Sequence, residues 1–318
     1  MRDGIIGHTK ILDFFDKVMA AGNLSHAYCF VGPSRVGKKT VAESLSASLF
    51  GVSRDKLRQQ PDFMPIEQGL NQKTGKLKKN IDVEQIRELR NFLVRGSFLG
   101  GYKIAIIGEA NKLNDDSANV MLKTLEEPRG KSVIFLLATD EDALPKTVSS
   151  RCQIVYFHPV AKADMEKFIL SRVADSARAR EMARLSGGLP GRVMEWLANN
   201  DDYEAYKKEA VRFIGLFHQP FFAKLKRVED LFAAHERAGA AADHIAEREK
   251  ILRIMDVWLG VLRGFMHINH HLLDAKLKFN LSDAGILKIT GLINDTRDAL
   301  RKNIHPRLLL EGMLLEIP

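Results

Sequence analysis

The chain has 318 residues, of which 45% are apolar and 28% are charged, and this composition excludes a disordered or fibrous protein. The length predicts two or three domains. A net charge of +8 permits a place near nucleic acid, although a basic surface without such a partner is an equally good interpretation. The N-terminus does not resemble a signal peptide and no apolar run approaches ~18 residues, so we expect a cytoplasmic protein without a membrane-spanning helix.

The two cysteines, Cys29 and Cys152, each lie beside an apolar stretch. Their spacing fits neither a zinc site nor a disulfide framework. We therefore expect both to be buried thiols that pack as small apolar residues.

From residue 10 to about residue 157, short apolar runs alternate with segments of helical period, which predicts a parallel sheet flanked by helices. Residues 103–108 and 132–139 are apolar at nearly every position, so we expect central strands that are covered on both faces. The other expected strands are residues 28–32, 62–66 and 153–157. The expected helices are residues 41–50, 83–94 and 115–128, the last stopped by Pro128.

Residues 68–80 are polar and basic and have neither a helical nor a strand period. The simplest interpretation is a loop or hairpin in solvent, and a contact with DNA is the alternative.

After residue 158 the strand-like runs end and helical patterns continue to the end of the chain. Residues 163–174, 177–186 and 190–200 predict a small helical domain, with Pro190 at an early position of its last helix. Within the remaining region, residues 235–265 predict one or two long amphipathic helices.

Residues 32–38 fit the phosphate-loop pattern G-x-x-x-x-G-K, with Gly32, Gly37 and Lys38 at its fixed positions. The pattern lies between an expected strand and an expected helix, as phosphate binding requires. Glycines let backbone N–H groups approach phosphate oxygens, the helix N-terminus adds partial positive charge, and Lys38 would reach the outer phosphates. The motif and its place between a strand and a helix therefore predict a phosphate-loop fold.

Both positions that normally hold magnesium carry unsuitable residues. The residue after Lys38 should be Ser or Thr, but it is Lys39, and Thr40 comes one residue late, about 100° around the helix. The Asp expected at the end of a buried strand is Gly108. Glu109 could be a base that activates water, but we favour a surface residue, because the metal that such a base needs has no protein ligand left.

Three further motifs, residues 119–128, 144–152 and 187–192, follow the phosphate loop in this order. Together they resemble the AAA+ clamp-loader family of bacterial DNA replication. The resemblance runs from about Gly7 to Arg192 and continues more loosely to residues 303–317, which are similar to the final helix of that family. It implies an AAA+ α/β domain at 1–158, a small helical lid domain at 159–200 and a helical collar domain for oligomerisation at 201–318.

The resemblance also implies roles for individual residues. Arg151, in Ser-Arg-Cys, matches the arginine that reaches ATP on a neighbouring subunit; the alternative is an Arg that caps an interdomain strand. Thr139 falls at the sensor 1 position and Arg192 at the sensor 2 position, where each could be a structural remnant. Many family members carry a four-cysteine zinc module that is absent from residues 50–63 of this chain.

The family's ATPase subunits keep the magnesium ligands, so the degenerate site favours a subunit without intrinsic catalysis. The expected partners are the other clamp-loader subunits in a hetero-pentamer and, through the assembly, the sliding clamp and primer-template DNA. ATP and magnesium are expected on the neighbours, with weak or no nucleotide binding here. One alternative is an active ATPase that uses Thr40 and Glu109. Another is a nucleic-acid-binding regulator on an AAA+ scaffold, although residues after Asp201 carry no helix-turn-helix signal.

Overall fold

The computed structural model describes residues 4–69, 78, 80–127, 130–142, 144–217, 219–236, 244–267, 282–301 and 305–317. The chain folds into two compact units, unit 1 with Met1–Met165 and Leu189–Gly191, and unit 2 with Glu166–Gly188 and Arg192–Pro318. The division into three domains at 1–158, 159–200 and 201–318 stays a prediction. Most of the polar segment 68–80 and the helix-stopping Pro128 lie outside the described residues.

Unit 1 is built on a five-stranded parallel sheet with the order β2-β3-β4-β1-β5. All five expected strands are present: β1 (Ala27–Val31), β2 (Phe63–Ile66), β3 (Lys103–Ile107), β4 (Ser132–Ala138) and β5 (Gln153–Tyr156). The expectation of central, doubly covered strands is confirmed, because β3 and β4 are interior strands in which every residue is buried. Since all strands run in one direction, the loops that follow them lie along one edge of the sheet.

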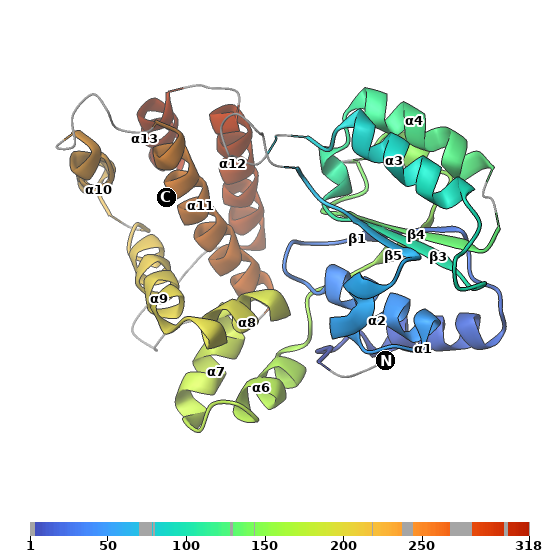
Figure 1. The fold of residues 1–318 in the computed structure, drawn as a ribbon. Helices are drawn as coiled ribbons and strands as arrows, with labels where there is room; N and C mark the ends of the chain where they lie inside the picture. Colours follow the sequence, from blue (N-terminus) through green and yellow to red (C-terminus); the bar gives the residue numbers. More distant parts are fainter. Residues whose placement is uncertain are drawn as a thin grey trace. The chain divides into compact units, whose positions relative to one another are not determined.

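Two layers of helices cover the sheet of unit 1 (Figure 1). On one face lie α1 (Thr9–Ala20) and α2 (Lys38–Phe50), which bury an aromatic cluster that includes Phe15, Tyr28 and Phe30. On the other face lie α3 (Val83–Val94) and α4 (Asp115–Glu126). Alternate strand residues point to opposite faces, so Cys29 packs with Leu89 and Met121 on this second side. The sequence pattern and the α/β phosphate-loop fold class therefore agree.

Several short or atypical elements were not expected from the sequence. Helix α1 begins after His8, which has left-handed backbone dihedrals and no side-chain cap, so the usual Ser, Thr, Asp or Asn start signal is missing. Helix α2 begins at Lys38 rather than at residue 41. The remaining unexpected elements are η1 (Arg54–Gln59), η2 (Ala110–Lys112) and α5 (Lys146–Ser149), each too short to show a hydrophobic period.

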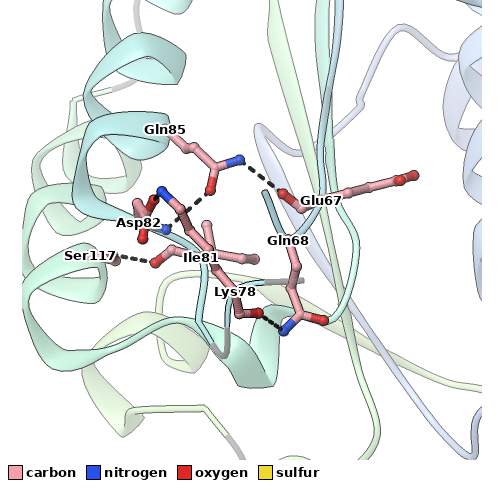
Figure 2. Close-up of polar contacts among 7 residues, drawn as sticks. All are labelled: Glu67, Gln68, Lys78, Ile81, Asp82, Gln85 and Ser117. Atoms are coloured by element: carbon pink, nitrogen blue, oxygen red, sulfur yellow. Dashed lines mark hydrogen bonds and ion pairs between the residues drawn. The ribbon is translucent and has the colours of Figure 1, made fainter. Parts of the chain in front are cut away.

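The start of α3 is tied to the segment that follows β2 (Figure 2). Asp82 and Gln85 form a capping box, in which Gln85 Oε1 accepts from the Asp82 N–H at 3.1 Å. The amide of Gln85 also donates to the Glu67 carbonyl oxygen at 2.8 Å. The hydroxyl of Ser117 in α4 donates to the Ile81 carbonyl oxygen at 2.9 Å. These bonds fix the backbone of Glu67 relative to α3.

In the described part of unit 2 all regular elements are helices. They are α6 (Lys162–Leu170), which starts in unit 1, α7 (Ser176–Leu185), α8 (Pro190–Ala198), α9 (Asn200–Ile214), α10 (Phe221–Glu236), α11 (His244–His267), α12 (Asp283–Arg301) and α13 (Pro306–Glu316). Helix α11 packs against α7, α9 and α12, and α13 packs against α10 and α12. Pro190 is the first residue of α8, as expected, and the expected final helix is α13.

Neither cysteine is in a disulfide. Cys29 is buried, as expected, whereas Cys152 is only half-buried at the edge of the same core. Burial raises the pKa of the Cys29 thiol to about 11 and that of Cys152 to about 12, so both are protonated at neutral pH. Among the described residues, no group of three or more metal-binding side chains is found and no helix could cross a bilayer.

Candidate functional site

The phosphate loop runs from the end of β1 to the start of α2, and its glycines are required by its shape. Gly32 has a φ of 154°, and a Cβ there would lie 2.3 Å from the carbonyl oxygen of Phe157. Gly37 caps α2 with a φ of 113°, in the left-handed region that other residues rarely adopt. Both fixed glycines of the motif therefore serve the backbone path of the loop.

Lys38, the first residue of α2, is buried beneath this loop. Its ammonium group donates to the carbonyl oxygens of Gly32 and Pro33, the latter at 2.9 Å. Burial lowers the pKa of Lys38 to about 8, and the negative charges that Cys29 and Glu109 can carry act in the opposite direction. At neutral pH the group is still mostly charged, so Lys38 and the free N–H groups of the first turn of α2 form an anion-binding environment.

Two other segments hold the loop. His8 Nε2 donates to the Val36 carbonyl oxygen at 2.8 Å, and the His8 ring lies 4.9 Å from the Phe157 ring, centroid to centroid. The N–H of Gly191 donates to the Arg35 carbonyl oxygen at 2.8 Å. A Cβ at Gly191 would lie 3.0 Å from atoms of Arg35, so glycine allows this approach without a shift of either segment. Sequence reasoning noticed residues 187–192 as a motif but not this contact, which joins positions far apart in the chain.

The position of the first missing metal ligand is occupied by an ion pair. Lys39 Nζ donates to Glu67 Oε1 at 2.6 Å, and Arg58 Nη2 lies 3.4 Å from the same oxygen. The hydrogen bond from Lys39 is the largest cause of a lowered pKa for Glu67. Glu67 follows β2 and Arg58 lies in η1, and sequence reasoning assigned neither of them to the site. A polar residue directly after an apolar run was the available signal for Glu67.

The position of the second missing ligand lies beside this pair. The Gly108 N–H donates to the Ile66 carbonyl oxygen at 2.9 Å, which continues the pairing of β2 with β3. A Cβ at Gly108 would lie 3.7 Å from Glu67 Cγ, an ordinary van der Waals contact. The Glu67 side chain therefore passes close to the place where a residue-108 side chain would begin.

The remaining candidates on this edge differ in exposure. Thr40 is half-buried in the first turn of α2, and Glu109 is exposed with a left-handed φ of 52°. Thr139 is also exposed, and its hydroxyl donates to Asp140 Oδ2 at 3.0 Å. Because β1, β3 and β4 are parallel neighbours, the phosphate loop, Gly108, Glu109 and Thr139 all follow strands at the same edge of the sheet.

Arg151 lies on unit 1 in the turn after α5, with 35% of its side chain exposed. Its Nη2 forms an ion pair with Glu126 Oε1 at 2.6 Å, and its Nη1 donates to the Thr147 carbonyl oxygen at 2.8 Å. Glu126 is the last residue of α4. The guanidinium group is thus held at the surface by two separate groups.

Arg192 belongs to unit 2, where its side chain is buried. Its Nη1 donates to the carbonyl oxygen of Ser186 at 3.3 Å and contacts the Tyr206 hydroxyl at 3.0 Å, and the guanidinium lies 4.8 Å from the Tyr206 ring centroid. A Cβ on Gly260 would lie 2.6 Å from Arg192 Nη1, so glycine leaves the space that this side chain fills.

The residues at this edge fit a phosphate group but not its usual metal. Gly32, Gly37 and Lys38 supply the loop path, the helix N-terminus and the cation that bind phosphate oxygens. Lys39 and Gly108 supply no metal-binding oxygen from their side chains. The arrangement can bind an anion, and it offers no protein ligand at either usual magnesium position.

Comparison with known proteins gives a consistent set of relatives. A family model described as DNA polymerase III, delta subunit, matches residues 7–161. The DNA polymerase III subunit delta' of Pseudomonas aeruginosa is 32% identical over 182 residues, which cover 52% of this chain and 54% of the relative. Subunit gamma of Buchnera aphidicola is 31% identical over 170 residues, or 52% of this chain and 47% of that protein. Subunit delta' of Bacillus subtilis is 28% identical over 206 residues, or 62% and 60%. The chain spans about half the length of the curated relatives it matches.

Proposed function

Because residues 7–161 belong to the clamp-loader family of DNA polymerase III subunits, we propose that this chain is a non-hydrolysing, delta-prime-type subunit of that clamp loader. It would work within the DNA polymerase III holoenzyme as one member of a hetero-pentamer with gamma/tau-type and delta-type subunits. ATP and magnesium on the neighbours would open the sliding clamp and load it onto primer-template DNA. The chain itself would bind nucleotide weakly or not at all at its degenerate phosphate loop.

The observation that carries this proposal is the pair of substitutions at the metal positions, Lys39 and Gly108. Relatives named delta' and gamma align with similar identities, 32% and 31%, so sequence similarity does not decide between the two types. Phosphoryl transfer depends on a metal that offsets phosphate charge. A chain without a protein ligand at either usual metal position fits the role of a subunit that assists hydrolysis elsewhere.

The main rival is a gamma/tau-like active ATPase that uses Thr40 and Glu109. The Lys39–Glu67 ion pair argues against it, because a positively charged side chain stands at a position that normally holds the metal. A nucleic-acid-binding regulator on an AAA+ scaffold is supported by nothing beyond the net charge of +8.

Arg151 is proposed as an arginine finger that acts on ATP held by a neighbouring subunit. The proposal is supported by its place on the α/β unit, its partial exposure and its two surface contacts. A planar, permanently charged guanidinium suits the charge that develops on the γ-phosphate. Its ion pair with Glu126 holds the guanidinium at the surface of unit 1.

The helices of residues 201–318 are proposed to carry most of the contacts between subunits. Exposed apolar side chains support this, among them Phe222 on α10 and Leu308 and Leu315 on α13, with 78%, 66% and 60% exposure. Helices α10 and α13 pack against one another, so these residues lie on neighbouring elements. Apolar side chains of this size commonly become buried in oligomers.

Co-purification with candidate gamma/tau-type and delta-type subunits, followed by an ATPase assay, tests the proposed function. We expect a complex whose DNA-stimulated hydrolysis requires this chain, and no hydrolysis by the chain alone. A Phe222→Ser/Leu308→Ser variant should be recovered less well in the complex, whereas Phe98→Ser, which changes an exposed residue of unit 1, is the matched control. Hydrolysis by the mixture that is equal with and without the chain would contradict the proposal.

A further inference from the structure

We propose that the Lys39–Glu67 ion pair replaces the divalent metal of the phosphate loop, so that the loop binds a nucleoside diphosphate without a metal ion. This deepens the proposed function and rests on its phosphate-loop part, since it names the ligand class and the reason why the metal is dispensable.

Three elements converge on the pair. Lys39 comes from the first turn of α2, Glu67 follows β2, and the empty side-chain position of Gly108 follows β3. The Lys39 ammonium is 2.6 Å from Glu67 Oε1, and the position of a Gly108 Cβ is 3.7 Å from Glu67 Cγ. The pair thus lies between the two backbone positions from which a phosphate-loop protein holds magnesium.

The charges at this point are rearranged rather than lost. In the usual site, a hydroxyl and a carboxylate from the strand corresponding to β3 hold a divalent cation. Here the carboxylate comes from the adjacent strand, β2, and the cation is a side chain on α2. A divalent ion would have to displace both Lys39 and Arg58 from Glu67 while facing their positive charges.

The absence of a carboxylate at residue 108 is not explained by a lack of space. Gly108 does not have a left-handed φ, and a Cβ there would lie 3.6 Å from the Ile66 carbonyl oxygen and 3.7 Å from Glu67 Cγ. An Asp there would place a second negative charge beside Glu67, which costs free energy unless a cation neutralises both. Lys39 can neutralise only one carboxylate, that of Glu67. A residue without charge at position 108, such as glycine, therefore keeps the charges at this point balanced.

Glu67 is held in place for this role. Its carbonyl oxygen accepts from the Gln85 amide at 2.8 Å, and Figure 2 shows its side chain extending away from the Asp82–Gln85 cap. Both side chains of the Lys39–Glu67 pair are about half exposed, at 51% and 50%, so a ligand can reach them. The backbone of Glu67 is thereby fixed, and the ammonium that pairs with its side chain is open to solvent.

A diphosphate carries enough negative charge to need a counter-charge, and this chain supplies two lysines in succession. Lys38 lies under the loop and Lys39 at its outer side, both at the N-terminus of α2. Cationic side chains and helix N–H groups can bind phosphate oxygens through charge-assisted hydrogen bonds. The two lysines can therefore take over the charge-offsetting part of the role of a metal.

Calorimetric titration of ADP into the full chain, once in EDTA and once in magnesium chloride, tests this inference. For the unmodified chain we expect affinities that agree within about twofold in the two buffers. Lys39→Thr should weaken binding in EDTA about tenfold or more, because the internal cation is gone. Lys10→Thr, which replaces an exposed lysine of α1, is the matched control and should change nothing.

The double variant Lys39→Thr/Gly108→Asp restores the usual ligand types, and its ADP affinity should rise about tenfold or more with magnesium. Lys39→Met serves if that variant does not fold, and it should lose affinity in EDTA as Lys39→Thr does. The inference is overturned by an unmodified chain that gives no heat with ADP, or that binds about tenfold more tightly with magnesium. Unchanged EDTA affinity in Lys39→Thr and Lys39→Met, or no magnesium dependence in a folded double variant, overturns it equally.

These outcomes are distinguishable from a failure of the proposed function. Magnesium-dependent ADP binding without ATP turnover would overturn the metal replacement and leave a non-hydrolysing subunit in place. ATP turnover by the isolated chain would instead contradict the proposed function.

Discussion

Two lysine–carboxylate pairs lie at opposite ends of β2 and β3, and they differ in almost every physical respect. At the amino ends, Asp62 and Lys103 are 3.5 Å apart, and their side chains are 1% and 9% exposed. At the carboxyl ends, Glu67 and Lys39 are 2.6 Å apart and half exposed. A lysine–carboxylate pair is therefore part of the core at the amino ends of the strands, and a second such pair is part of a solvent-facing site at the carboxyl ends.

The buried pair organises local structure. Asp62 accepts hydrogen bonds from the N–H groups of Phe98 and Leu99, both at 2.9 Å, and from the Ser97 hydroxyl at 2.7 Å. The Lys103 ammonium lies 3.9 Å from the centroid of the Phe92 ring. Mutation of Asp62 would leave the Phe98 and Leu99 N–H groups and the Ser97 hydroxyl without this acceptor. This end of the sheet should therefore tolerate little change.

The exposed Lys39–Glu67 pair contributes differently. Because solvent screens the Lys39–Glu67 pair, its contribution to the free energy of folding is small. Stability therefore places little constraint on which residues occupy these two positions. Exposed ion pairs on this unit should therefore affect ligands and neighbours far more than stability, and the buried pair should do the reverse.

The largest effect is expected for Arg151→Ala, which removes the other exposed pair of interest, that with Glu126. Loss of an arginine finger lowers hydrolysis on the neighbouring subunit by up to roughly 10³–10⁵, although other sites in the ring can mask part of the loss. Folding and assembly should be nearly unchanged, because a partly exposed pair contributes little. DNA-stimulated ATPase of the reconstituted complex and thermal unfolding of the isolated variant are the measurements.

Arg151→Lys should restore little of this activity, since a point charge does not reproduce the guanidinium fork. Arg90→Ala, on the exposed side of α3, is the control. Normal hydrolysis in a well-assembled Arg151→Ala complex would remove Arg151 from the site.

Asp62→Ala should destabilise unit 1 by about 3–5 kcal/mol, because it leaves Lys103 buried without its partner. Denaturant unfolding measures the change, with Glu88→Ala on the surface of α3 as the control. A loss below about 1 kcal/mol would place Asp62 with the exposed pairs and break the contrast.

The same carboxylate predicts a dependence on pH. Burial by itself raises the pKa of Asp62, but the hydrogen bonds of the Ser97–Leu99 turn and the charge of Lys103 outweigh it and lower the pKa. A lowered folded-state pKa contributes stability above the unfolded value near 3.9, and that stability is lost as pH falls through the folded-state pKa. Asp62→Asn should lack this part of the acid dependence, and a parallel loss in both proteins would contradict it.

A smaller effect is expected at Lys38. Since its pKa is about 8, the lysine loses its charge between pH 7 and pH 9. Affinity for ADP should fall by about tenfold over this interval, because only the charged form attracts phosphate. Lys38→Arg stays charged and should show a flatter profile in the same titration, and identical profiles would argue against Lys38 as the group responsible.

The smallest effect is expected for the stability of Glu67→Gln. The variant removes the negative charge that pairs with Lys39 and Arg58, yet both Lys39 and Glu67 are half exposed, so the unfolding free energy should change by less than about 1 kcal/mol. A loss of about 3 kcal/mol or more in denaturant unfolding would mean that the pair is structural, as at Asp62.

Sequence patterns predicted the parts of the fold that depend on local chemistry. Uninterrupted apolar runs placed β3 and β4 in the interior of the sheet, and the glycines and lysine of residues 32–38 located the phosphate loop. The start of α1 was missed, because its cap residue, His8, is not a typical start signal.

The residues that complete the candidate site could not be read from the sequence in the same way. Glu67 meets Lys39 only because β2 pairs with β3, and Gly191 meets Arg35 only because a segment far along the chain returns to the loop. Such contacts depend on strand order and packing, which no local pattern encodes. The roles proposed for Arg151, Thr139 and Arg192 came from family resemblance and stay predictions.

The rate of ATP hydrolysis by the isolated chain, in saturating magnesium and compared with Lys38→Ala, tests the central claim most directly. Because Lys39 and Gly108 leave both usual magnesium positions without a protein ligand, we expect no turnover above that of the Lys38→Ala variant. A steady-state rate near ~1 s⁻¹ that Lys38→Ala abolishes would contradict the account of a non-hydrolysing subunit.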